Sequence, residues 1–437
     1  MLTRRRLLAG LAGSAGTGIL AEIGATQPGV PAEQENDHAH LVRATTNTDR
    51  WDAVVVGAGV FGTWTAWNLR RAGKRVLLLD AWGAAHARAS SGGESRLIRT
   101  AYGPDEIYTR MAWESLADWK WLSARAGLPI LQQVGVLFFF AQKESYATRT
   151  LEVHERLGLP IQSLGRAELA RRFPQFSWND IEMGLYEPDC GALMARRAVQ
   201  TLVSQFSSAG GEYRLAAVQL QPSPGHAETG DTLDSLVLSG GERVHAAQYV
   251  FACGPWLPKL FPDLLASRMF VTRQEVFWFA PPSADAGFGP GSMPGWADFN
   301  GGDIYYGLPD LESRGVKLAH DRHGPRMDPD VGDRELSPGE LADVRAYMAR
   351  RFPALAGRPL NEARVCQYEN SSNGDFIIDR HPRWRNVLLV GAGSGHGFKH
   401  GPAVGAYAAR RVLGESVTLE PRFSLSGKAD TQQRTVR

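Results

Sequence analysis

The chain has few cysteines and little net charge. Cys190, Cys253 and Cys366 are the only thiols among 437 residues, so the sequence contains no disulfide framework. The formal net charge is +2, and loss of residues 1–25, with three arginines and one glutamate, would leave a neutral chain. A nearly neutral chain gives no reason to propose a polyanion as a partner, so we expect no nucleic-acid partner. No internal repeat or low-complexity block stands out.

The sequence also lacks an apolar run long enough to cross a membrane. Its N-terminal apolar stretch, residues 9–21, is short and rich in glycine. This stretch follows Thr3-Arg-Arg-Arg-Leu-Leu8, which resembles a twin-arginine export signal. We predict a signal peptide at 1–25, export to the periplasm or the exterior, and no stable membrane span; the alternative is a disordered basic tail. The polar segment 26–50 is expected to be a linker.

Glycine is concentrated in two turns near opposite ends of the chain. The first turn lies between a predicted strand, 52–56, and a predicted helix, 60–72. Asp80 closes the next predicted strand, where an acid accepts hydrogen bonds from a ribose. The turn has the pattern G-x-G-x-x-G and is formed by Gly57, Gly59, Val60 and Gly62. Together these features predict a dinucleotide site; the alternative is a turn that only permits tight packing.

The second turn lies between a predicted strand, 387–390, and a predicted helix, 400–413. Each turn gathers backbone N–H groups and a helix N-terminus around an anion. The first turn alone leaves NAD and FAD open, but two distant turns indicate one extended cofactor held at both ends, which favours FAD. Lys399 ends the second turn and is expected to attract an anion, whereas His396 is expected to serve packing. The glycines of this turn are Gly391, Gly393, Gly395 and Gly397.

Two arginines follow a run of small residues that begins at Ser90. Arg96 and Arg99 are three residues apart, a spacing that puts side chains on one face of a helix. Guanidinium groups bind carboxylates in a two-pronged geometry. These residues therefore indicate an anion site near Ser95, with surface ion pairs as the alternative.

The periodic segments predict two interleaved domains, which 437 residues are enough to form. We predict an α/β fold in which a Rossmann-like FAD-binding domain is interleaved with a mixed-sheet, α+β substrate domain. The segment 281–301 is rich in Gly and Pro and is expected to be a surface loop, and 419–437 is expected to be a C-terminal tail. The FAD-binding domain is assigned to 51–130, 190–268 and 360–418, and the substrate domain to 131–189 and 269–359.

Six motifs occur in order along the chain: Arg96-Leu-Ile-Arg-Thr-Ala-Tyr-Gly103, Ile304-Tyr-Tyr-Gly307, Gly315-Val-Lys-Leu318, Val365-Cys-Gln-Tyr368, Phe376-Ile-Ile-Asp379 and Ser394-Gly-His-Gly-Phe-Lys399. On the basis of these motifs, the chain resembles the monomeric sarcosine oxidase and N-methyltryptophan oxidase family of flavin amine oxidases. This family is part of the D-amino acid oxidase-like superfamily. The resemblance extends from Asp52 to about residue 418. It implies FAD as the cofactor, and a role for each matching residue.

The resemblance implies that Cys366 bonds through sulfur to the 8α-methyl group of the flavin. It implies that Lys317 holds a water over flavin N5 and promotes the reaction with oxygen, as a cation there would. Arg99 and Lys399 match the pair that binds the substrate carboxylate, and Arg96 matches an arginine near the flavin ring. Three tyrosines match positions that line the substrate pocket, although core packing also suits them: Tyr102, Tyr306 and Tyr368.

The chain departs from the sarcosine oxidase pattern at three positions. Gly92 stands where a histidine often lies beside the flavin, and Gly393 stands where sarcosine oxidases carry phenylalanine. Asp321, preceded by His320, replaces an active-site histidine. These changes widen or repolarise the pocket and favour an amine bulkier than sarcosine.

We therefore predict an FAD-dependent oxidase that acts on the CH–NH bond of a secondary or N-methylated amine or amino acid. Hydride passes to the flavin, O2 becomes hydrogen peroxide, and the imine is hydrolysed. The expected partners are a small-molecule amine and O2, and the protein is expected to be a monomer without a metal. The alternatives are a dehydrogenase with another electron acceptor, against which Lys317 argues, and a non-catalytic flavin-binding subunit. Three intact cations count against that subunit: Arg99, Lys317 and Lys399.

Overall fold

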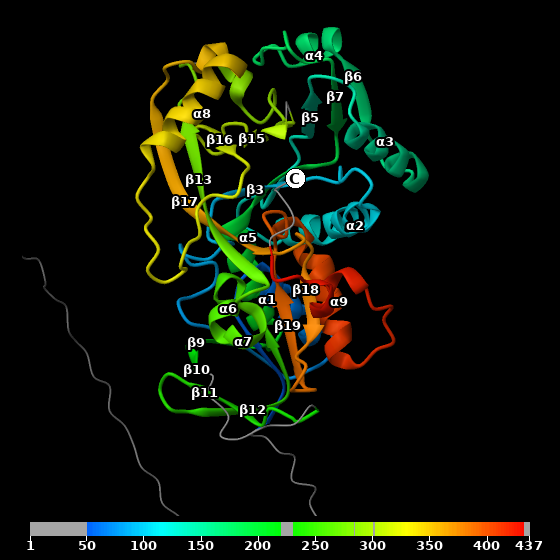
Figure 1. Ribbon diagram of the computed structural model, residues 1–437, viewed down its shortest axis with the longest axis vertical. Helices are drawn as coiled ribbons and strands as arrows, with labels where there is room; N and C mark the ends of the chain where they lie inside the picture. The colour runs from blue at the N-terminus through cyan, green and yellow to red at the C-terminus, as the bar shows by residue number, and fades with distance from the viewer. Residues whose placement is uncertain (1–49, 220–229, 284, 300–301, 432–437) are drawn as a thin grey trace, which may run out of the picture. The chain divides into compact units, whose positions relative to one another are not determined.

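The computed structural model describes residues 50–219, 230–283, 285–299 and 302–431 (Figure 1). The predicted signal peptide, the predicted linker up to Asp49 and the last six residues of the predicted tail lie outside these ranges. The described residues form two eight-stranded sheets and a third of three strands. No described helix is long and apolar enough to cross a membrane.

The first sheet has a parallel centre and antiparallel margins. β1 pairs in parallel with β2 and β12, β2 with β9, and β12 with β19, whereas β10 and β11 pair antiparallel, as do β11 with β12 and β18 with β19. Parallel strands covered on both faces are continuously apolar, as the first four residues of β2 are. The strands are β1 (Arg50–Val56), β2 (Val76–Asp80), β9 (Glu212–Leu215), β10 (Val218–Gln219), β11 (Ser235–Leu238), β12 (Arg243–Phe251), β18 (Ile377–Arg380) and β19 (Val387–Gly391).

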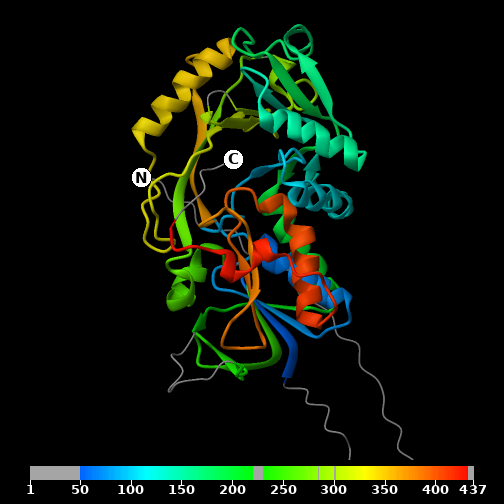
Figure 2. The same ribbon diagram turned by 45° about the vertical axis from the view of Figure 1, so that its right-hand side comes forward.

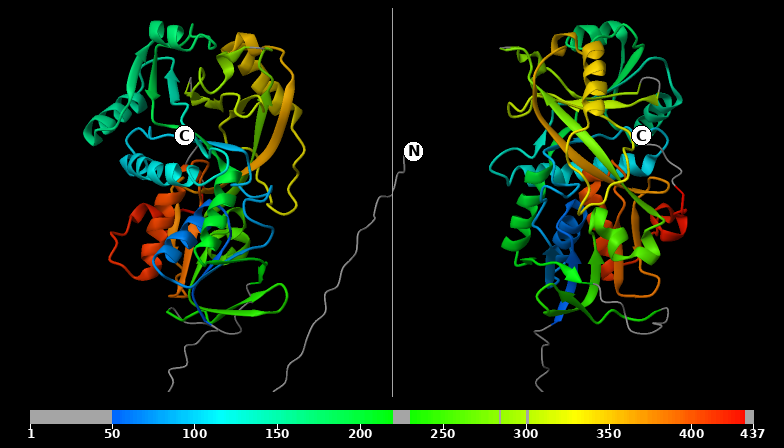
Figure 3. Two further views of the ribbon diagram at one scale, coloured as in Figure 1. Left: turned by 180° about the vertical axis from the view of Figure 1, so that it is seen from behind. Right: turned by 60° about the vertical axis from the view of Figure 1, so that its left-hand side comes forward.

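Alternate residues of β1 enter separate cores on the two faces of this sheet. Ala53 and Val55 pack with four helices, which Figure 3 shows beside the sheet: α1 (Val60–Arg71), α2 (Glu106–Ser123), α5 (Ala195–Ser208) and α9 (Gly401–Leu413). Val54 and Val56 pack on the other face with Leu257 and Leu265, which belong to the short helices α6 (Leu257–Leu260) and α7 (Pro262–Leu265). The predicted Rossmann-like arrangement is confirmed.

The second sheet is mixed and has the order β17-β13-β16-β15-β14-β5-β7-β6. The helix α8 (Pro338–Arg351) covers one face (Figure 2), and α3 (Ser145–Leu157) and α4 (Arg166–Arg172) lie near its far end. In β13, Phe277 and Phe279 pack toward α8, whereas Val276 and Trp278 face the opposite side. The strands are β5 (Val136–Phe140), β6 (Gln162–Gly165), β7 (Met183–Glu187), β13 (Met269–Phe279), β14 (Gly295–Asp298), β15 (Tyr305–Leu308), β16 (Val316–His320) and β17 (Leu360–Ser371).

The third sheet is small and antiparallel. It consists of β3 (Ser95–Ile98), β8 (Gly191–Met194) and β4 (Leu131–Gln132), with β8 in the centre. Short 3-10 turns complete the described elements: η1 (Gly254–Trp256), η2 (Ala286–Phe288), η4 (Pro353–Leu355), η5 (Phe398–His400), η6 (Pro421–Phe423) and η7 (Leu425–Gly427).

Three segments differ from the expectations drawn from the sequence. Within 281–301, expected to be a loop, β14 is a fully buried strand between β5 and β15. β17, whose first residue was taken as the start of an FAD-binding segment, pairs with β13 of the second sheet along its length. The described part of the predicted tail is packed against the protein, because Phe423 and Lys428 are buried.

Candidate cofactor and substrate site

Two neighbouring cavities share part of their walls and together are called the channel here. The first, here called the turn cavity, lies over the first glycine turn and is bordered by Asp80 and Trp256. The second, the sheet cavity, lies against β13, β15 and β17. Measured out to their open mouths, the turn cavity and the sheet cavity enclose about 1000 and 1430 Å³. Six residues line both cavities: Val60, Phe61, Ala89, Ser90, Ser91 and Glu369.

The first glycine turn has no room for side chains at two positions. Gly57 has φ +103°, and a Cβ there would lie 2.4 Å from the carbonyl oxygen of Ala252. A Cβ on Gly62 would lie 1.9 Å from the carbonyl oxygen of Gly57, so α1 begins directly against the turn. Gly59 is the N-cap of α1. The backbone N–H groups at this helix start therefore lie beside the turn cavity, as anion binding requires.

Asp80 ties the end of β2 to this turn. Its Oδ2 accepts a hydrogen bond from the Ala58 N–H at 2.8 Å, and its Oδ1 accepts from Trp82 N and Gly83 N, each at 2.9 Å. The carboxylate therefore has a structural role in the turn and also borders the turn cavity, where the sequence predicted ribose recognition.

Substitution of Gly62 by alanine is expected to destabilise the protein, because the new Cβ would collide with backbone rather than with a movable side chain. Overpacking of this kind costs about 1–3 kcal/mol, and we expect the purified variant to melt at a lower temperature and to carry less flavin. Thermal unfolding and visible absorbance measure both effects. Gly127→Ala is the matched control, because no atom lies within 4 Å of its added Cβ. Equal melting temperatures and flavin contents in the two variants would contradict the prediction.

The second glycine turn lies against the first. A Cβ on Gly397 would lie 2.7 Å from the Gly393 Cα and 2.8 Å from the ring of Phe61 in α1. Ala392 and Ser394 have positive φ values of 56° and 48°, conformations that non-glycine residues seldom adopt. The turn thus stores backbone strain and holds its peptide groups next to the sheet cavity. Three of its glycines line that cavity: Gly393, Gly395 and Gly397.

Glu369 lies where the two cavities meet and was not singled out from the sequence. Its Oε2 accepts a hydrogen bond from Ser90 Oγ at 2.7 Å, and its Oε1 accepts a long one from Gly393 N at 3.4 Å. Burial raises the pKa of this carboxyl group. Its position directly after the motif Val365-Cys-Gln-Tyr368 is the one sequence signal that points to it.

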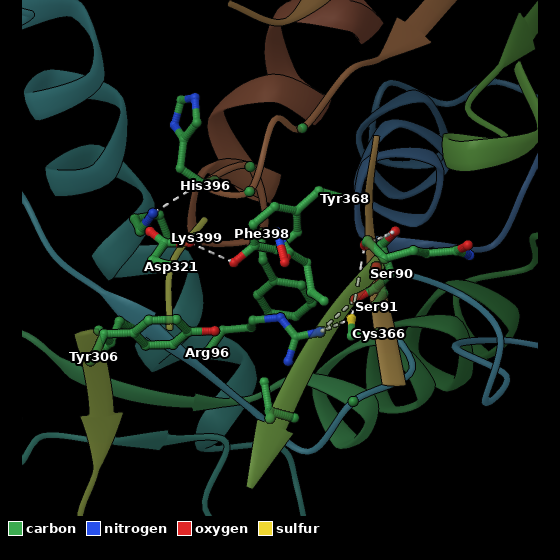
Figure 4. A pocket seen from close by; sticks show the side chains of 18 of the residues that line it. Ser90, Ser91, Arg96, Tyr306, Asp321, Cys366, Tyr368, His396, Phe398 and Lys399 are labelled. Atoms are coloured by element: carbon green, nitrogen blue, oxygen red, sulfur yellow. Dashed lines mark hydrogen bonds between the residues drawn. The ribbon is translucent and has the colours of Figure 1, made fainter. Parts of the chain in front are cut away.

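Arg96 lies against Cys366 in the sheet cavity (Figure 4). Its guanidinium donates to Ser90 O at 2.6 Å and to Ser95 O at 2.8 Å, and lies 3.6 Å from Cys366 Sγ. The expectation that Arg96 and Arg99 share a helix face is wrong, because residues 95–98 form a strand, in which residues three apart point to opposite faces.

Arg99 and Lys399 lie together at the other end of the sheet cavity. The Arg99 guanidinium lies 4.1 Å from the centre of the Tyr102 ring. Lys399 Nζ donates to Tyr102 Oη at 2.9 Å and to His396 O at 2.8 Å. Burial and the nearby Arg99 cation lower the pKa of Lys399. Tyr102 does not line the sheet cavity, and its hydroxyl contacts Lys399 from behind the wall. His396, which was expected to serve packing, is buried among aromatic rings and also lines the cavity.

Asp321, Tyr306 and Tyr368 form a polar group on the wall beside these cations (Figure 4). Tyr368 Oη donates to Asp321 Oδ1 at 2.9 Å. Burial raises the pKa of Asp321 to about 6, against the opposing effects of the Tyr368 hydrogen bond and of Arg99. Figure 4 shows Tyr368 between this acidic end and the end that holds Cys366.

Lys317 lies on the cavity-facing side of β16, just behind the wall. Its Nζ donates to Ser95 O at 2.8 Å and lies 5.6 Å from the Trp278 ring centre and 5.8 Å from that of Tyr306. Trp278 and Tyr306 both line the sheet cavity. Burial and the Arg96 cation lower the pKa of Lys317 to about 7.

The channel fits an FAD molecule. Gly57, Gly59 and the start of α1 line the turn cavity, and the residues that line both cavities connect it to the cavity that holds Cys366 and the cations. A group with a nucleotide at one end and a flavin at the other matches this length and polarity. Among the described residues, no group of three or more His, Cys, Asp or Glu side chains is placed to bind a metal.

Comparisons with known proteins agree with this geometry. The profile of the family described as "DAO: FAD dependent oxidoreductase" matches residues 52–411. Human peroxisomal sarcosine oxidase is 31% identical over 394 residues, which cover 87% of this chain and 98% of that protein. N-methyl-L-tryptophan oxidase of Salmonella heidelberg is 30% identical, covering 86% of this chain and 97% of that protein.

Solved structures share the fold. The amino acid oxidase NikD, in its open form, has a TM-score of 0.69 at 20% identity and covers 86% of this chain and 98% of its own. L-proline dehydrogenase from P. horikoshii has a TM-score of 0.73 at 18% identity and covers 86% of this chain and 97% of its own. The sequence matches and the dinucleotide channel lead to one assignment: the chain belongs to the DAO family of FAD-dependent oxidoreductases.

Proposed function

We propose that the protein is an oxidase of a secondary or N-methylated amino acid, with FAD bonded to Cys366 and O2 as the electron acceptor. The observation that carries this proposal is the sheet cavity, which has Arg99 and Lys399 at one end and Cys366 with Arg96 at the other. FAD, when bound, takes the hydride from the C–H bond beside the amine nitrogen and passes the electrons to O2, which yields hydrogen peroxide and an imine that water hydrolyses.

The chain's own residues supply binding, orientation and charge. Arg99 and Lys399 bind the substrate carboxylate, because two buried cations favour an anion strongly. The aromatic rings of Phe138, Tyr306 and Trp278 exclude water from the space between those cations and Cys366. Lys317 places a cation behind this wall, which stabilises the negative charge that develops when oxygen is reduced.

Two departures from the sarcosine oxidase pattern bear on substrate size. Gly393 lines the sheet cavity, so the absence of a phenylalanine there leaves room for a substrate bulkier than sarcosine. Glycine at position 92 has a different explanation. A Cβ at this position would lie 2.0 Å from the carbonyl oxygen of His86. The path of the loop, and not the substrate, requires glycine at that position.

The proposal includes location and assembly. The pattern from Thr3 to Leu8 supports export by the twin-arginine route to the periplasm or the exterior. Fractionation of cells that express the full chain, compared with an Arg4→Lys, Arg5→Lys, Arg6→Lys variant, tests the route. A relative in a Bacillus species that bears the name monomeric sarcosine oxidase, 28% identical over 83% of this chain and 92% of that protein, supports a monomer, which sedimentation can test.

An amine panel tests the proposed activity. Sarcosine, N-methyl-L-tryptophan and L-proline are added to the purified protein in air and under argon. We expect peroxide release in air, and loss of the visible flavin band under argon, with at least one of them. Bleaching without peroxide would indicate a dehydrogenase, and no bleaching would support a non-catalytic flavin-binding subunit.

Arg99→Met is expected to weaken substrate binding more than it slows turnover, because the guanidinium binds the substrate carboxylate and does not contact the C–H bond that reacts. Loss of one partner of a buried charge pair costs about 2–5 kcal/mol, so KM should rise roughly 30-fold or more. Arg149→Met is the control, since Arg149 pairs with Glu152 on the surface. Steady-state kinetics of peroxide release measure the effect, and an unchanged KM would remove Arg99 from carboxylate binding.

A further inference from the structure

Asp321 presents one carboxylate oxygen to the sheet cavity. Its Oδ1 accepts the hydrogen bond from Tyr368, and its backbone N–H donates to Ile304 O at 2.6 Å. Within the part of the chain that the structure describes, Asp321 forms no salt bridge, and its Oδ2 accepts no hydrogen bond from a protein group. Oδ2 is nevertheless not a fully buried atom. Oδ2 therefore faces the open space of the cavity.

The carboxylate is held in one orientation by the two elements beside it. It follows directly after β16, and Tyr368 comes from β17 across the cavity wall. Figure 4 shows Asp321 next to Lys399, with Tyr368 turned toward it. The ionisable groups that act on it are two phenols, two cations and one imidazole: Tyr306, Tyr368, Arg99, Lys399 and His320.

This wall thus brings two basic side chains, Arg99 and Lys399, close enough to the Asp321 carboxylate to act on its charge. The free amino acid has the complementary pattern, since its carboxylate and its ammonium group are separated by a single carbon. A carboxylate bound by Arg99 and Lys399 leaves the ammonium group close to a third charged side chain. Opposite charges in a buried site favour this arrangement, whereas a second substrate carboxylate near Asp321 would be repelled.

We propose that Asp321 accepts the ammonium proton of the bound amino acid, so that the amine nitrogen has a free lone pair before its C–H bond is broken. The inference rests on the proposed function. The N–H bond breaks, its electron pair stays on nitrogen, and the proton forms an O–H bond with Oδ2 of Asp321. The proton is later released to water, and no oxidant or reductant is needed.

Electrostatics of the site favour this transfer. In water the proton stays on the amine, but Arg99 and Lys399 disfavour a third cation beside them and so lower the pKa of the bound ammonium group. Burial raises the pKa of Asp321 to about 6, so its carboxylate is ionised at pH 7 yet is a better base than a solvated aspartate. The Tyr368 hydrogen bond holds the acceptor in place throughout.

Asp321→Asn removes the base but keeps an oxygen that can accept from Tyr368. The compound of the amine panel that bleaches the wild-type flavin fastest is mixed anaerobically with each protein between pH 6 and pH 10. At pH 7 we expect the rate constant for bleaching to fall about 100-fold in Asp321→Asn. The deficit should shrink toward pH 10, where solution already supplies the neutral amine. A residue with only a structural role would give a deficit that does not change with pH.

Two further variants and one ligand sharpen the test. Asp321→His restores a base that titrates near neutral pH and should recover part of the rate. Asp303→Asn removes a largely exposed carboxylate that pairs with His320 and should keep the wild-type rate. Binding of the matching acid without nitrogen (butyrate, indole-3-propionate or cyclopentanecarboxylate) is followed by the shift of the flavin band. The nitrogen-free acid should bind to Asp321→Asn at least as tightly as to the wild-type protein, because the substitution removes an anion beside Arg99 and Lys399.

The outcomes separate the two proposals. A wild-type rate and pH profile in Asp321→Asn would overturn the inference while leaving the oxidase intact. A deficit that is constant across pH, or weaker binding of the nitrogen-free acid, would assign Asp321 a structural role and also overturn it. If Asp321→Asn cannot retain flavin, the test rests on Asp321→His. A folded Asp321→His protein that shows no recovery of the rate would also overturn the inference. No bleaching of the wild-type protein by any amine would overturn the proposed function itself.

Discussion

Replacement of Cys366 by serine is expected to release all the flavin from the acid-precipitated protein, whereas the wild-type pellet stays yellow. Cys366 lines the sheet cavity, and its Sγ lies 3.6 Å from the Arg96 guanidinium. A serine hydroxyl has no comparable nucleophilicity at neutral pH, so the covalent bond to the cofactor cannot form. Absorbance of pellet and supernatant after precipitation with acid measures the outcome.

Cys253→Ser is the matched control for attachment. Cys253 also borders the channel, but it lies in the turn cavity, its Sγ contacts Val56 O at 3.3 Å, and burial raises its pKa. We expect the flavin of Cys253→Ser to stay with the pellet. A colourless wild-type pellet would show that the cofactor is held without a covalent bond.

Lys317→Met is expected to slow the reaction of the reduced protein with oxygen by about 10²–10³-fold, the usual effect of removing one preorganised electrostatic group. The methionine keeps the length and apolar stem of the lysine but removes the cation beside Trp278 and Tyr306. Return of the visible flavin band after anaerobically reduced protein is mixed with oxygen measures the rate. Anaerobic reduction by substrate should change much less, since Lys317 lies behind the wall.

The same lysine predicts a pH dependence. Burial and Arg96 lower the pKa of Lys317 to about 7, so the cation is present below that pH and is lost as pH rises through it. The wild-type oxygen reaction should therefore slow between pH 6 and pH 8, whereas that of Lys317→Met should stay flat. Lys259→Met is the control, because Lys259 pairs with Asp328 on the surface. An unchanged oxygen rate in Lys317→Met would remove the residue from this role.

Local sequence patterns predicted the elements that frame the channel. The predicted strand 52–56, helix 60–72 and strand 75–80 correspond to β1, α1 and β2 within one or two residues. Apolar runs ending at glycine specify such units locally, because the turn that follows admits no side chain. β14 was missed for the opposite reason: its four residues lie among glycines and prolines, and only pairing with β5 and β15 makes them a strand.

The candidate site was predictable where a residue lies inside an ordered motif. Arg99, Cys366 and Lys399 were found by resemblance, and the structure brings all three to the sheet cavity. Glu369 was missed because nothing local distinguishes a channel carboxylate from a surface one. Asp321 stood out only as a departure from the family pattern, and its relation to Tyr368 appears once β16 and β17 are placed in one sheet.

The sequence by itself determined the class of cofactor, since two glycine turns after buried strands impose their backbone geometry whatever surrounds them. The tertiary structure alone decided which charges meet. The positions 99, 321 and 399 are far apart along the chain, and their mutual effects on pKa depend on burial in a common cavity. Coulomb energies and desolvation depend on distance and dielectric in three dimensions, and neither quantity is encoded in the spacing of residues along the chain.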